Sequence, residues 1–195
     1  MSMPGLTPSQ TAGPYFSMRL AAPGENVLAS DAISGERIRI DGVLVDGAGH
    51  HIEDGLIEVW QANAGGRYRH PDDGRDPIPL EAGFTGFGRA QTSFEDGSFH
   101  IATVKPGAVP DPEGEPQAPH LNVIVQGRGM LRPCFTRIYF SDEEEANEHD
   151  LVLGMVPVDR RHTLIARKVE SSADPTVFEI VLRFQGSDET VFFSF

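Results

Sequence analysis

The sequence predicts an all-β protein: an antiparallel β-sandwich with an extended N-terminal arm and one or two short helices. Roughly eight to ten short segments alternate apolar and polar residues, as strands with one buried face do. Glycine (21 residues) and proline (15) are abundant, which fits many turns between short strands. Helical periodicity is almost absent. These patterns indicate a sandwich rather than an α/β fold.

Two parts of the chain differ in pattern. Residues 1–34 scatter proline, glycine, serine and threonine without a sustained period, which predicts an arm that is ordered only where it packs on something. Residues 35–195 carry the alternating segments and form the expected sandwich domain. One domain suits a chain of 195 residues.

The first strand begins the sandwich with a change of parity. Ile38 and Ile40 face one way, whereas Val43 and Val45 fall on the opposite parity. A β-bulge at Asp41-Gly42 would bring both pairs to one face. The other expected strands cover 56–60, 99–104, 120–126, 134–140, 163–169, 177–184 and 190–195.

The segments between the expected strands have the composition of loops, with one exception. Residues 63–81 are rich in glycine and proline, and residues 109–119 are acidic and rich in proline, so both are expected to be loops. Residues 141–144, Ser-Asp-Glu-Glu, form a capping-box pattern. This pattern predicts a short helix that runs to about His149.

Charge and cysteine content exclude several classes of protein. Lys and Arg number 16 and Asp and Glu 29, so the net charge is −13, which argues against nucleic acid or an anionic membrane as a partner. No apolar run approaches the roughly 20 residues of a membrane span, and residues 1–16 lack a signal-peptide pattern. The single cysteine, Cys134, excludes an internal disulfide and points to a reduced, cytoplasmic setting.

Metal-ligating chemistry is weakly represented. His120 and Asn122 are two residues apart on an expected strand, so they share a face. One imidazole and one neutral amide are a poor ligand set, and the residues themselves favour a hydrogen-bonded histidine near the sheet surface. Further partners could come from elsewhere in the chain: Tyr68, His70, His100 and Tyr139.

One basic segment differs from the acidic background. Residues 127–133 place Arg128 and Arg132 in an expected turn. Arginine can hold a carboxylate through two hydrogen bonds, and an anionic ligand of so acidic a chain needs a local patch of this kind. A surface turn with solvated arginines is the simpler alternative. Nucleophile-elbow, P-loop and dinucleotide motifs are absent from the sequence.

Several stretches, taken in order, resemble the intradiol ring-cleavage dioxygenases. They are residues 55–70 (GLIEVWQANAGGRYRH), 86–89 (GFGR), 103–107 (TVKPG) and 118–120 (APH). The resemblance covers about residue 35 to the C-terminus and implies the β-sandwich of that family. It also implies O₂-dependent cleavage of an aromatic ring between two hydroxyl-bearing carbons.

The arm narrows this resemblance to one kind of family member. Residues 7–15, His120 with Asn122, and residues 189–195 are similar to one chain of an enzyme that is built from two homologous chains. In that enzyme the beta chain holds a non-haem Fe(III) through two tyrosines and two histidines. The resemblance therefore implies a homologous beta subunit as partner, in an αβ unit that oligomerises further.

The ligand positions implied by the resemblance depart from the family pattern. The first tyrosine falls near Asp76, the second is Ala108, and the second histidine is Asn122. Only His120 matches, and the arginine that usually precedes the histidines is Gln117. The resemblance thus implies that Fe(III) is bound by the partner beta chain and not by this chain.

The arm and the arginine turn take a different role in the resemblance. Thr11, Gly13, Pro14 and Tyr15 are implied to line the partner's substrate cavity, and Arg128 to offset the charge of an aromatic carboxylate there. Two alternatives stay open. The chain could be a non-catalytic sandwich that binds an anionic ligand unaided, or a self-sufficient dioxygenase, against which the missing ligands argue.

Overall fold

The computed structural model describes residues 5–11, 13, 20–170 and 174–194. Eight strands form one sheet in the order β3-β2-β7-β8-β9-β10-β1-β4, and two short strands, β5 and β6, form a separate pair. The strands are β1 Arg37–Val45, β2 Leu56–Trp60, β3 Phe87–Gln91, β4 Ser98–Val104, β5 Val109–Pro110, β6 Pro116–Gln117, β7 His120–Gln126, β8 Cys134–Phe140, β9 Ile165–Lys168 and β10 Thr176–Arg183.

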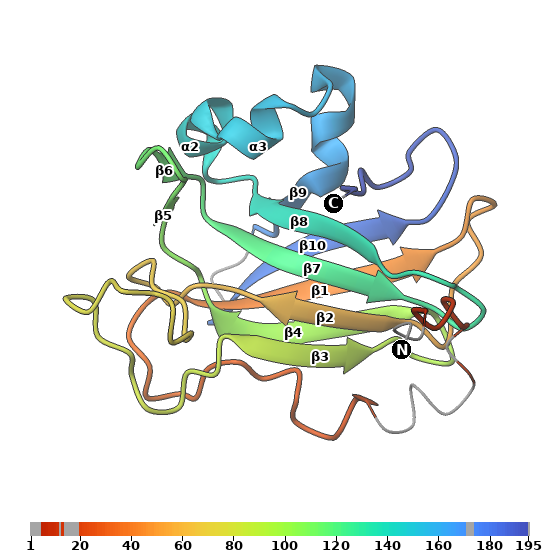
Figure 1. Cartoon of the computed structure of the whole chain (residues 1–195), viewed down its shortest axis with the longest axis horizontal. Helices are drawn as coiled ribbons and strands as arrows, with labels where there is room; N and C mark the ends of the chain where they lie inside the picture. Colours follow the sequence, from red (N-terminus) through yellow and green to blue (C-terminus); the bar gives the residue numbers. More distant parts are fainter. Residues whose placement is uncertain (1–4, 12, 14–19, 171–173, 195) are drawn as a thin grey trace.

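The large sheet curls over until β7, β8 and β2 lie in front of β10, β1 and β4 (Figure 1). The apolar core fills the space between the two halves and takes side chains from all eight strands of this sheet. The all-β class is therefore confirmed. Most strand pairs are antiparallel as expected, but β1 pairs with β10, and β8 with β9, in parallel.

Strand β1 does not contain the expected bulge. Its register with β10 runs without interruption from Ile38 to Val45, so Ile38, Gly42 and Leu44 all face inward. The ring of Phe99 occupies the space above Gly42, where an added Cβ would lie 2.2 Å from the Phe99 Cζ. The prediction was wrong because Gly42 itself takes the inward position between Ile40 and Leu44, so the alternation continues without a bulge.

A segment of the expected arm closes the curled sheet. The amide of Leu28 donates to the carbonyl of Ala102 in β4 at 2.8 Å, and the amide of Arg89 in β3 donates to the carbonyl of Glu25 at 2.9 Å. Residues 25–28 therefore bridge the two edge strands, and Leu28 is fully buried. We call residues 25–28 the strap.

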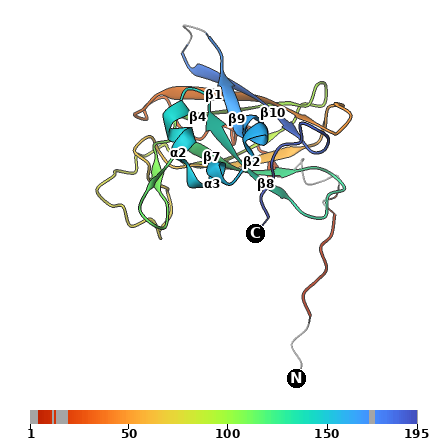
Figure 2. The ribbon, with the colours of Figure 1, turned by 90° about the horizontal axis from the view of Figure 1, so that it is seen from above.

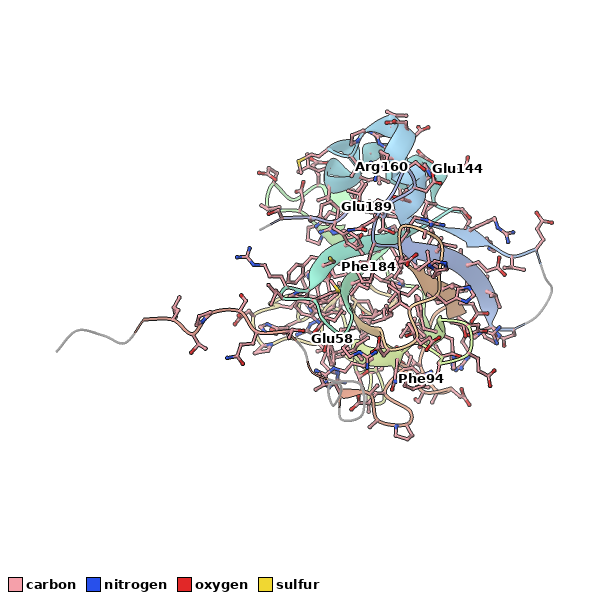
Figure 3. The ribbon with its side chains drawn as sticks, turned by 90° about the vertical axis from the view of Figure 1, so that its right-hand side faces the viewer. Glu58, Phe94, Glu144, Arg160, Phe184 and Glu189 are labelled. Carbon is pink, nitrogen blue, oxygen red and sulfur yellow. The ribbon has the colours of Figure 1, made fainter. Side chains whose placement is uncertain are left out.

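Short helices cover one end of the sheet. They are α2 Glu144–His149, α3 Leu151–Gly154 and the 3₁₀ helix η1 Val158–Leu164. Arg160 of η1 donates to the carbonyl of Glu189 at 2.6 Å, which ties the C-terminal segment to this end. Glu144 and Arg160 lie there together, whereas Phe94 lies near the opposite end (Figure 3). In the described part of the chain no helix is long and apolar enough to span a membrane.

Two local expectations need correction. Helix α2 ends at His149 as expected, but no side-chain hydrogen bond caps its start. The Ser141 hydroxyl instead accepts from the amide of Lys168, and Asp142 pairs with Lys105 and Lys168, so the capping box does not form. Residues 190–194 form no strand and make a single bridge, from Phe193 to Phe135.

Candidate functional site

Two rows of outward side chains cross strands β3, β2, β7 and β8 in register. The cross-strand pairing aligns Phe87, Trp60, Asn122 and Arg137 in one row. It aligns Arg89, Glu58, Ile124 and Phe135 in the next. Because alternate strand residues face opposite sides, these rows lie outside the core, which holds the intervening residues.

A hollow of about 320 Å³ lies over these rows. Its walls are mainly apolar, and Trp60 and Phe87 are 40% and 44% exposed. Glu58, Asn122 and Arg137 supply polar groups to the lining, and Phe193 of the C-terminal segment also contributes. A concave, mostly apolar surface with several aromatic rings and a few polar groups has the composition of a small-molecule site.

His120 precedes Asn122 by two residues on β7, just outside the hollow, and is 3% exposed. Its Nδ1–H donates to the carbonyl of Ala118 at 2.8 Å, which leaves the buried Nε2 without a partner among the described residues. Burial, followed by the charge of Arg137, lowers the pKa of His120 to about 4. The imidazole is therefore neutral near pH 7.

Asn122 binds Tyr68, which the sequence offered as one of four further partners for this face. Its side-chain amide donates to the Tyr68 hydroxyl at 3.0 Å, and the Tyr68 ring packs against Trp60 with centroids 4.8 Å apart. Burial raises the pKa of Tyr68. Asp76, where the sequence placed the first tyrosine position, is exposed and pairs with Arg67 at 2.6 Å. The structure therefore groups Tyr68, and not Asp76, with Asn122.

A buried network fixes the other side of His120. Arg137 Nη1 donates to Gln117 Oε1 at 2.8 Å and to the Tyr139 hydroxyl at 3.3 Å. Tyr139, the cross-strand partner of His120, donates to Asp150 at 2.9 Å. Asp150 also accepts from the Ala118 amide at 2.9 Å and caps α3, so the helical end is joined directly to β7 and β8.

Ala108 lies in a loop that packs against the loop of Tyr68. The amide of Gly107 donates to the carbonyl of Asn63 at 2.9 Å, and Gly66, with φ +85°, brings its backbone against the Ala108 carbonyl. A Cβ at Gly66 would lie 2.1 Å from that oxygen, so only glycine fits this approach. Ala108 itself offers no side-chain donor atom.

The residues around His120 do not fit an Fe(III) ion. They offer one bare imidazole nitrogen and two phenols kept neutral by burial, Tyr68 and Tyr139. The Tyr139 hydroxyl already donates to Asp150, and Asn122 turns its NH₂ group toward Tyr68. Anionic oxygen ligands, which would stabilise the ferric state, do not converge there. Across the described ranges, no group of three or more His, Cys, Asp or Glu side chains is placed to hold a metal.

Gln10 of the arm lies beside the turn of residues 127–133. Gln10 shares a hollow of about 180 Å³ with Gly127, Met130 and Arg132. Residues 5–11 run outward on the side of β7 and β8 (Figure 2), and both Thr11 and Gly13 are exposed. The other two implied cavity residues, Pro14 and Tyr15, lie outside the described residues.

Arg128 has a charged partner that the sequence did not reveal. Its Nε lies 3.0 Å from Asp54 Oδ2, with the arginine side chain 62% exposed and the aspartate 21%. Asp54 precedes β2, far from the turn in sequence. The sequence around Arg128 and the sequence around Asp54 do not predict this pair.

A family model described as "Dioxygenase" matches residues 11–185. The protocatechuate 3,4-dioxygenase alpha chain of Pseudomonas putida is 42% identical over 97% of this chain and 96% of its own length. The chain belongs to the dioxygenase family. Another relative in this family, the protocatechuate 3,4-dioxygenase beta chain of Burkholderia cepacia, is 33% identical over 91% of this chain and 78% of its own length.

A solved structure from the dioxygenase family has the same fold. It is the 3-chlorocatechol 1,2-dioxygenase of Rhodococcus opacus 1CP, with a TM-score of 0.62 and 22% identity. The match covers 80% of this chain and 62% of that longer one. At this identity the likeness concerns the fold alone.

Proposed function

We propose that this chain is the alpha subunit of a protocatechuate 3,4-dioxygenase. The unit it forms with a homologous beta subunit cleaves protocatechuate between its hydroxyl-bearing carbons, consumes O₂ and yields 3-carboxy-cis,cis-muconate. The observation that carries this proposal is the 42% identity to an alpha chain across nearly the whole length of both proteins. The residues around His120, which do not fit an Fe(III) ion, agree with a subunit that supports the iron site of its partner.

The beta subunit holds the Fe(III) in this proposal, and the ion supplies the oxidation chemistry. The support lies in the donor atoms of this chain. His120 offers one nitrogen, Asn122 stands where a second histidine is needed, and Ala108 stands where a tyrosine is needed. An iron-binding alpha chain would require at least two further anionic or imidazole ligands.

This chain contributes shape and charge to the partner's substrate cavity. Thr11, Gly13, Pro14 and Tyr15 of the arm form part of its wall, and Arg128 binds the substrate carboxylate. The support is positional: Gln10, next to Thr11, lies against the turn that carries Arg128. A positive group matters here because the chain carries a net charge of −13, which otherwise repels an anionic substrate.

We also place this function in a reducing, cytoplasmic compartment. The single cysteine supports this location, and burial raises the pKa of the Cys134 thiol, which keeps it protonated and unreactive.

Purification with and without the partner tests the proposal. The chain purified alone is expected to be colourless and to contain far less than one iron per chain. Co-expression with a beta chain is expected to give a wine-red complex that takes up O₂ with protocatechuate. A red, stoichiometrically ferric chain without its partner would overturn the assignment of iron to the beta subunit. A complex without O₂ uptake would overturn the function.

A further inference from the structure

We propose that the hollow over β2, β7 and β8 is a binding site for a small aromatic carboxylate, with Arg137 as its anion-binding group. This site belongs to the alpha chain itself and needs no iron. It goes beyond the proposed function, which places substrate in the partner's cavity. Three features carry it: an arginine without a charged partner among the described residues, aromatic side chains in the walls, and a volume that fits a single ring.

No carboxylate of the described residues neutralises the charge of Arg137. Its Nη1 donates to Gln117 and Tyr139, both neutral oxygen atoms, and within the described chain no carboxylate lies within 4.0 Å of it. Neither Nε nor Nη2 has a hydrogen-bond partner there, so one edge of the guanidinium remains available. In the adjacent row, Arg89 is already paired with Glu58 at 2.6 Å. Arg137 is therefore the group in this hollow that attracts an anion.

The shape and walls select a planar aromatic ligand. About 320 Å³ is the lower end of the range of ordinary ligand pockets, which suits a single ring. Trp60, Phe87 and Phe135 supply the apolar surface that such a ring would bury. The available edge of a guanidinium matches a carboxylate through two parallel hydrogen bonds, which a neutral amide cannot reproduce.

The opposite outer face also carries a hollow, of about 570 Å³, but its charged side chains are paired with one another. On β1, Arg39 and Asp41 form an ion pair at 2.7 Å, and Arg167 of β9 pairs with Glu179 of β10. The charges there are satisfied within the face. The hollow over β2, β7 and β8 differs because its cation has no charged partner among the described residues. Two of its rings, Trp60 and Phe87, also stay 40% and 44% exposed, although Tyr68 and Arg89 contact them.

Trp60 provides a direct reporter, because it is the single tryptophan of the chain and lines the hollow. Benzoate added to the full-length chain is expected to change Trp60 fluorescence saturably, and calorimetry should give the same dissociation constant. Arg137→Gln should weaken binding at least tenfold, Arg137→Lys should weaken it less, and benzamide should bind at least tenfold more weakly than benzoate. Arg39→Gln, at an ion-paired arginine of the opposite outer face, is the control and should leave binding unchanged.

Equal benzoate affinity in the wild type and Arg137→Gln, with circular dichroism unchanged, would overturn the site. Equal binding of benzamide would do the same. The remaining occupant is the beta subunit itself: loss of co-purification in Arg137→Gln without any loss of benzoate affinity would identify the hollow as a subunit interface instead. Oxygen uptake by the wild-type complex tests the proposed function separately, so either conclusion can fail while the other stands.

Discussion

Arg128 and Asp54 form an ion pair in which the aspartate meets only the Nε of the guanidinium, at 3.0 Å. The two terminal nitrogens have no hydrogen-bond partner among the described residues and remain free to bind a second carboxylate. An exposed pair of this kind contributes about 1 kcal/mol at most to folding. We therefore expect the ion pair to act mainly by holding the Arg128 side chain beside the arm, where substrate is proposed to bind.

Replacement of Arg128 should weaken substrate binding in the assembled enzyme. In the complex with a beta chain, Arg128→Gln is expected to raise KM for protocatechuate about tenfold, because a charge-assisted hydrogen bond is lost. The iron content per complex should not change. Steady-state oxygen uptake and metal analysis measure the two quantities. Arg39→Gln, an ion-paired arginine on the opposite face, is the control, and an unchanged KM in Arg128→Gln would remove this residue from the substrate site.

Asp54 is expected to act through Arg128. Asp54→Asn should raise KM by a smaller factor than Arg128→Gln, since the guanidinium remains but is no longer held. The double variant should be no worse than Arg128→Gln alone, as expected for two residues that act as a unit. The same oxygen-uptake assay completes this double-mutant cycle. Additive effects in the double variant would show that Asp54 acts independently.

Gly42 should be intolerant of any side chain. Gly42→Ala places a Cβ 2.2 Å from the Phe99 ring, so the ring must move within a filled core. Such overpacking costs about 1–3 kcal/mol of unfolding free energy. Urea denaturation measures the loss, and Gly74→Ala, where no atom lies within 4 Å of the new Cβ, is the control. Phe99→Leu in the Gly42→Ala background should recover part of the stability.

His120 should make stability depend on pH. Its pKa is lowered to about 4 from 6.5 by burial and by Arg137, so the unfolded chain binds the proton more readily than the folded one. The contribution of the neutral imidazole is fully present above about pH 6.5 and is lost as the pH falls toward 4. The full shift corresponds to about 3 kcal/mol.

Urea titrations at a series of pH values test this dependence. His120→Gln should flatten the fall in unfolding free energy between pH 6.5 and 4, whereas His50→Gln, at an exposed histidine, should leave it unchanged. A slope that persists in His120→Gln would assign the pH dependence to other groups.

Alternating segments predicted most of the sheet because burial imposes a period of two. Strands 56–60, 120–126 and 134–140 have the expected bounds. Strand β3, Phe87–Gln91, was missed because glycine and arginine interrupt its apolar pattern. The parallel pairing of β1 with β10 joins segments that are more than 130 residues apart, and no local pattern records such a pairing.

The candidate site was predicted less completely. The pattern singled out His120 and Asn122 and offered Tyr68 among four further partners, and the structure shows that Tyr68 is the one bonded to Asn122. Tyr68 lies in a loop rich in glycine, where spacing does not reveal side-chain direction. Arg137 carried no signal either, because an arginine within an alternating strand is ordinary. Its lack of a charged partner becomes visible only when the neighbouring strands are in place.

The strap has a mechanical consequence for the arm. Residues 25–28 are hydrogen-bonded to β3 on one side and to β4 on the other, so a truncation that ends before Glu25 would keep these bonds. Truncation beyond Glu25 would open a seam between β3 and β4 and leave two raw strand edges, the kind of surface on which chains stack into aggregates.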